Sequence, residues 1–148
     1  MSVSKLNGAA APTRAILIVA WLLWSHVAFA QSELSQAVAV AQDAWLGHRV
    51  AELLSASDTV RLRIPGIAPS ASMRPSQAGK LLEQYLKMAE ELEFSLRDIE
   101  EVAAGHAYAE FGRVYVVKGT AEQREETVFL GFRRIAEKWS LREVRVAP

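Results

Sequence analysis

The spacing of apolar residues predicts helices in the first half of the chain and strands in the second. A helix is expected from Ser32, its N-cap, to Trp45, and a shorter helix follows Gly47. Strict alternation over residues 58–64 predicts a half-buried strand. A third, amphipathic helix is expected to begin at Pro75, because proline needs no N–H donor in the first helical turn.

Four strands joined by short turns are expected after this helix, over residues 94–104, 107–118, 127–135 and 139–146. In the first of these strands, the alternation of inward-facing and outward-facing positions shifts around Asp98, which predicts a β-bulge. Consecutive strands with short turns form an antiparallel meander. The order of elements therefore predicts an α+β fold, in which N-terminal helices pack on a curved antiparallel sheet and the two enclose a cone, a cystatin-like roll.

The segment between the first strand and the third helix is expected to be a loop. Residues 65–75 contain three prolines, two serines and one glycine, all of which favour turns. Such a loop is long enough to fold over an opening in the cone.

The first thirty residues have the organisation of a secretory signal peptide. Lys5 and Arg14 precede an apolar run over residues 15–27, and Ala-Phe-Ala at 28–30 fits the small-x-small pattern of signal peptidase. The run is shorter than the roughly 20 residues of a membrane-spanning helix, although an uncleaved anchor is the alternative. The sequence thus predicts a leader over 1–30, the only part to meet a membrane, and one exported domain over 31–148. The periplasm is favoured, with full secretion as the other destination.

Composition narrows the chemistry of the exported domain. The chain has no cysteine, which excludes disulfides, thiol chemistry and cysteine zinc sites. Without Lys5 and Arg14, 15 basic residues stand against 17 acidic ones, so no basic excess points to nucleic acid. His48 and His106 are isolated and lack nearby carboxylates at ligand spacing. No metal and no cofactor are therefore expected.

Three residues are candidates for acid–base catalysis. Alternation could turn Asp98 and Glu110 into the cone, where desolvation would suit them to proton transfer. His106 is a histidine in a predicted turn, and histidine is the usual base near neutral pH. The default interpretation is a solvated or capping histidine and surface carboxylates paired with Arg97 or Arg113.

Three tyrosines are candidates for ligand binding. Tyr85, Tyr108 and Tyr115 would each offer an aromatic ring and a hydroxyl to a ligand in the cone. Ordinary packing, with the hydroxyl bound to a protein group, is the favoured explanation of the same residues.

The residues at both ends of the domain resemble the nuclear-transport-factor-2-like (SnoaL-like) superfamily. The first segment, 45–66, contains Trp-Leu-Gly between two helices and a strand that ends in Pro-Gly, and 116–120, 129–133 and 139–141 resemble that superfamily's last three strands. The resemblance implies a sheet-lined cavity and either a small isomerase or dehydratase or a non-catalytic domain. Steroid isomerases of this superfamily have an acidic base just before the proline that ends the first strand, and a donor tyrosine on the first helix. Both are absent here, because Ile64 occupies the position of the base and no tyrosine of the domain precedes Tyr85.

The leading functional hypothesis is a non-catalytic domain that binds a small apolar ligand or an exported protein. The alternative is a lyase or isomerase that uses Asp98, Glu110 or His106. A third possibility is a cone filled by side chains, which would be Phe94, Phe111, Leu82 and Leu86. A homodimer through the exposed sheet face is also expected, because the strand over 127–135 carries large apolar groups on both faces.

Overall fold

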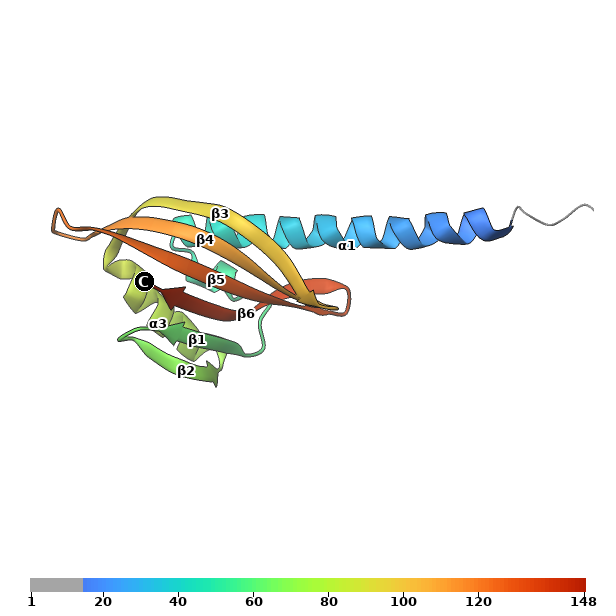
Figure 1. Ribbon diagram of the computed structural model, residues 1–148. Helices are drawn as coiled ribbons and strands as arrows, with labels where there is room; N and C mark the ends of the chain where they lie inside the picture. The colour runs from blue at the N-terminus through green and yellow to red at the C-terminus, as the bar shows by residue number, and fades with distance from the viewer. Residues whose placement is uncertain (1–14) are drawn as a thin grey trace, which may run out of the picture. The chain divides into compact units, whose positions relative to one another are not determined.

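The computed structural model describes the backbone from Ala15 to Pro148 and the side chains from Gln31 onward (Figure 1). Helix α1 runs without interruption over Ala15–Leu46, so the prediction that Ser32 caps its start is wrong. Residues 15–31 contain no glycine or proline that would end a helix. The side chains of the expected leader lie outside the described residues. Contacts divide the chain into residues 1–32 and 33–148, and the second unit is the subject from here on.

The helices of the second unit largely follow the predicted pattern. Helix α2 is a single turn over Val50–Leu53. Helix α3 covers Pro75–Lys87 with proline in its first turn, and it buries Ala78, Leu82 and Leu86 along one face. Of the described residues, no helix combines the length and apolarity that crossing a membrane requires.

Six strands form one mixed sheet that curves against the helices (Figure 1). They are β1 Val60–Ile64, β2 Ala68–Met73, β3 Ala89–Ala103, β4 His106–Val117, β5 Gln123–Ile135 and β6 Lys138–Ala147. Their order across the sheet is β2-β1-β6-β5-β4-β3. The antiparallel meander is confirmed for the last four strands, whereas β1 pairs with β6 in parallel. The α+β cone fold is therefore confirmed, with a sheet that is mixed rather than wholly antiparallel.

The predicted loop over 65–75 contains a strand instead. Strand β2 pairs with β1 in a hairpin, and its residues are small and mostly exposed, so no apolar alternation reveals them. Pro69 is tolerated because β2 lies at the edge of the sheet.

Strands β3 and β5 begin several residues earlier than predicted, at Ala89 and Gln123. Their first residues are mainly charged, which hides the alternation. The predicted bulge is confirmed, because the β3–β4 register shifts between Leu96 and Asp98.

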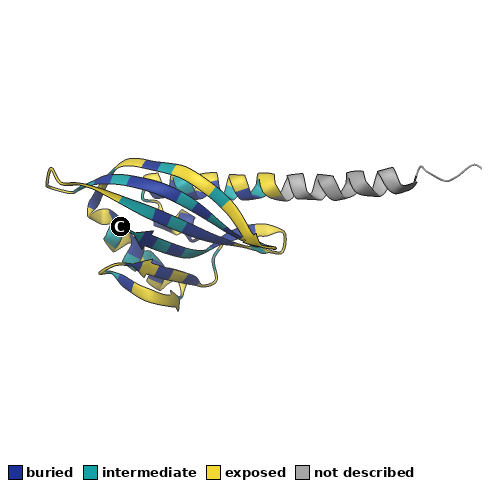
Figure 2. Ribbon diagram, in the orientation of Figure 1, coloured by how far each residue is buried: buried dark blue, intermediate teal, exposed yellow. Residues whose placement is uncertain are grey.

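Aromatic side chains fill the space between the helices and the sheet. Trp45 of α1 stacks on Phe94 with ring centres 4.8 Å apart, and Phe94 stacks on Phe111 at 4.4 Å. Leu82 and Leu86 of α3 are also buried, and Figure 2 shows the inner positions of β4 and β5 as buried. This part of the cone therefore holds the side chains that the filled-cone possibility names.

Candidate functional site

A buried arginine near one end of the cone is the centre of the candidate site. Arg113 lies on β4 between Phe111 and Tyr115, and alternation turns all three toward the helices. Only 1% of Arg113 is exposed. A buried guanidinium is costly unless it is paired, so its partners decide what this site can do.

Two carboxylates and a tyrosine bind the guanidinium. Arg113 Nε donates to both carboxylate oxygens of Glu91, at 3.2 and 3.0 Å. Arg113 Nη1 donates to Glu126 at 3.0 Å and also to the hydroxyl of Tyr85. The hydroxyls of Tyr85 and Tyr115 donate in turn to Glu126, the second at 2.9 Å. We call these five residues the Arg113 cluster.

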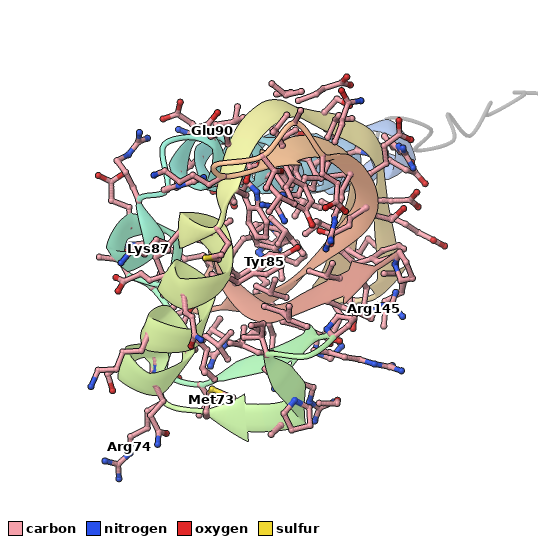
Figure 3. The ribbon with its side chains drawn as sticks, turned by 90° about the vertical axis from the view of Figure 1, so that its left-hand side faces the viewer. Met73, Arg74, Tyr85, Lys87, Glu90 and Arg145 are labelled. Carbon is pink, nitrogen blue, oxygen red and sulfur yellow. The ribbon has the colours of Figure 1, made fainter. Side chains whose placement is uncertain are left out.

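Aromatic rings surround the same cation. The guanidinium carbon of Arg113 lies 4.0 Å from the ring centre of Tyr115, 4.7 Å from that of Tyr85 and 5.5 Å from that of Trp45. Figure 3 shows Tyr85 between α3 and the sheet, inside the cone. Cation–π contacts of this kind strengthen when water is excluded.

The electrostatics of the cluster keep the arginine charged and the tyrosines neutral. Burial opposes the charge of Arg113, but its hydrogen bond to Glu91 and the nearby acidic groups outweigh burial and raise its pKa. Burial raises the pKa of both Tyr85 and Tyr115, and Glu126 adds to this. The tyrosines are therefore hydrogen-bond donors at neutral pH, and all three donor residues are bound to groups of the protein itself.

His48 lies where the cluster approaches the surface. It occupies the turn between α1 and α2 with a left-handed backbone, φ 52°, and its Nε2 lies 3.4 Å from Glu91 Oε1. Its side chain is 34% exposed. A surface pocket of about 510 Å³ is lined by His48, Glu91, Lys87 and Lys118 among others, so solvent reaches the cluster from this side.

The three predicted acid–base residues lie elsewhere. Asp98 and Glu110 stand directly opposite each other on β3 and β4, and Glu110 lies between two inward-facing residues of β4. Both therefore project from the outer face of the sheet, and the alternative in which they turn into the cone is wrong. Arg97 lies 3.9 Å from Glu110, as the surface interpretation expects. His106 is exposed at the start of β4.

The structure brings together two of the three predicted tyrosines. Tyr85 and Tyr115 belong to the Arg113 cluster, whereas Tyr108 lies on the outer face and donates to Glu143 at 3.0 Å. Among the side chains that the structure describes, no group of three or more His, Asp or Glu residues is placed to hold a metal ion.

Sequence reasoning missed the three charged members of the cluster. Glu126 precedes the strand predicted over 127–135, but it lies within β5 and its side chain is only 18% exposed. Glu91 lies in the part of β3 that was not predicted as strand. Arg113 could have been found, because alternation with Phe111 and Tyr115 already places it on the inner face of β4.

The curved sheet with helices on its inner face defines the nuclear-transport-factor-2-like, or NTF2-like, fold, and solved structures agree with this. A ketosteroid isomerase-like protein from Erwinia carotovora superposes with a TM-score of 0.63 at 12% identity, covering 78% of this chain and 92% of its own. An NTF2-like protein of unknown function from Pseudomonas putida gives 0.60 at 17%, covering 81% and 87%. A DUF4783 family protein from Bacteroides ovatus gives 0.59 at 12%, covering 73% and 91%.

The chain therefore has the NTF2-like fold. No family model matches its sequence, and no curated protein does. Identities this low carry the fold alone, and fold does not choose among the functions found on it.

Proposed function

We propose that this chain is a non-catalytic interaction domain that forms a homodimer through the outer face of its sheet. Two observations favour interaction over catalysis or ligand binding inside the cone. The stack of Trp45, Phe94 and Phe111 occupies space that a small apolar ligand would need. A lyase or isomerase using Asp98 or Glu110 lacks support, since both lie across the sheet from Tyr85 and Tyr115.

One row of side chains across the outer face carries the proposal. Each member of this row pairs with the next member on the neighbouring strand of the sheet. In order, they are Arg63 of β1, Arg145 of β6, Phe129 of β5, Glu110 of β4 and Asp98 of β3. None of the five is buried. This outer row thus runs from two cations through an aromatic ring to two carboxylates. The ring is covered on one side by Arg145, whose guanidinium carbon lies 4.1 Å from its centre.

Such a row is complementary to itself. A two-fold axis parallel to the strands at Phe129 would place this ring against its copy in the partner. The same axis would place Arg145 opposite the partner's Glu110 and Arg63 opposite the partner's Asp98. An axis across the strands would bring like charges together, so the charges also select the orientation of the two copies.

Charge reversal with rescue tests the dimer. Arg145→Glu and Glu110→Arg should each give a monomer in sedimentation at concentrations where the unaltered protein is a dimer. A mixture of the two variants should form a heterodimer, because each contact then joins opposite charges. Lys138→Glu, an exposed change at the first residue of β6, is the control and should leave the dimer intact. An unaltered protein that stays monomeric, or a mixture that does not associate, contradicts the proposal.

We also propose that the domain is exported after removal of residues 1–30, with the periplasm as its destination. The support is the sequence pattern of the leader alone. Mass spectrometry of the full-length product expressed in a bacterium should find a periplasmic protein that begins at Gln31. Recovery of an uncleaved product in the membrane fraction would favour the anchor instead.

A further inference from the structure

We propose that a groove at one end of the outer sheet face binds a small molecule with two oxyanion groups. The groove lies where β1 begins and where the β3–β4 and β5–β6 turns come side by side (Figure 1). Its volume is about 860 Å³, within the range of small-molecule sites. It is separate from the outer row and from the Arg113 cluster, so it does not depend on the proposed dimer.

Basic side chains from four strands converge on this groove. Arg61 comes from β1, His106 from β4, Arg133 and Arg134 from β5, and Arg142 from β6. The acidic lining residues are Asp58 and Glu143. The groove therefore has an excess of positive charge in a domain that has none overall.

The partners of these groups distinguish the free cations from the bound ones. Arg142 donates to Asp58 at 3.0 Å, and Arg134 is paired with Glu137. Among the described residues neither Arg61 nor Arg133 forms an ion pair, and both are exposed. Guanidinium groups with free N–H donors bind carboxylate or phosphate oxygens in a bidentate manner.

The floor of the groove near these two arginines is formed by the Tyr108 ring packed on Gly131. Gly131 contributes no side chain there, and the ring of Tyr108 lies against its backbone. The hydroxyl of Tyr108 is held by Glu143, so this acidic group is already engaged within the protein. Arg61 stands opposite Glu143 on one side, while Arg133 follows Gly131 by two residues on β5. Two unpaired cations on either side of a floor whose carboxylate is already hydrogen-bonded fit a ligand with two anionic groups better than a single anion.

Calorimetric titration of the full chain tests this site. Succinate and citrate represent carboxylates, and pyrophosphate represents phosphates. At least one of these series should bind more tightly than acetate, and the tighter series identifies the chemistry. Affinity should fall as salt is added, because the contacts are charged and exposed.

Two substitutions and a control make the result specific. Arg61→Gln and Arg133→Gln should each weaken binding by about tenfold or more, since a hydrogen bond to a charged group is lost. Both residues are exposed, so the fold should remain, as circular dichroism can verify. Lys118→Gln removes an exposed charge from the β4–β5 turn and should change nothing.

Equal binding of acetate and the larger anions, or equal affinities in all variants, overturns the proposal in favour of general charge attraction. The titration is repeated with Arg145→Glu, which does not line the groove. Binding by that variant when it is monomeric shows that the groove works without the dimer. Loss of binding only in Arg145→Glu would contradict an independent site.

Discussion

Arg113 and Glu126 stand directly opposite each other on β4 and β5, and their side chains meet at 3.0 Å although that of Arg113 has no exposure to solvent. Glu91 approaches the same guanidinium from β3, on the other side of β4. Tyr85 adds a contact from α3. The cluster thus joins three neighbouring strands to a helix through charged hydrogen bonds, at the end of the cone where the aromatic stack stops.

Replacing the buried cation should destabilise the domain strongly. Arg113→Met removes the charge but keeps a long apolar side chain, so Glu91 and Glu126 lose their shared partner. Removal of one member of a buried ion pair costs roughly 3–5 kcal/mol. Urea unfolding followed by circular dichroism measures the free energy of unfolding. The control is Arg97→Met, whose exposed pair with Glu110 should contribute about 1 kcal/mol or less. Equal stabilities of the two variants would show that the cluster is not a structural ion pair.

The buried tyrosines should make the domain sensitive to alkali. Burial raises the pKa of Tyr85 in the folded state, while in the unfolded chain it ionises near pH 10. The stabilisation from this shift is therefore complete below about pH 10 and is lost as the pH rises toward the folded-state pKa. Unfolding free energies measured between about pH 8 and 12 should fall less steeply for Tyr85→Phe than for the unaltered protein. Parallel curves, or free ionisation of Tyr85 in the folded protein, would contradict this.

The aromatic stack of Trp45, Phe94 and Phe111 should contribute to the stability of the domain about as much as the Arg113 cluster does. Phe94→Ala leaves a cavity between Trp45 and Phe111 and should cost roughly 3–5 kcal/mol, because the rings on both sides lose their contacts. Leu96→Ala on the same strand is the control, since Leu96 is 41% exposed and should cost much less. Thermal unfolding compares the two. A small effect of Phe94→Ala would mean that the stack can collapse around the missing ring.

The sequence predicted helix α3 and the meander well, because their apolar spacing is regular and the β3–β4 and β4–β5 turns carry glycine. It failed where polar residues face inward. The first residues of β3 and β5 carry Glu91 and Glu126, which face Arg113, and a pattern that assigns charges to solvent cannot recognise them. The change in apolar alternation around Asp98 was enough to predict the bulge. It did not show which face Asp98 lies on, because this follows from its pairing with Glu110, and only the strand register reveals that pairing.

Two glycines on the outer face should respond differently to the addition of one methyl group. A Cβ at Gly131 would lie 2.9 Å from the Tyr108 ring and 3.0 Å from Glu143 Cβ, which sits on neighbouring strand β6. Gly131→Ala should therefore destabilise the domain by roughly 1–3 kcal/mol, as is typical of overpacking. At Gly112 the nearest atoms belong to the end of the exposed Arg97 side chain, which can move away, so Gly112→Ala should be nearly neutral. Urea unfolding of both variants measures the difference, and citrate titration of Gly131→Ala adds a second readout at the floor of the groove. If both alanine variants were equally stable, the packing of Tyr108 on Gly131 would not constrain this face of the sheet.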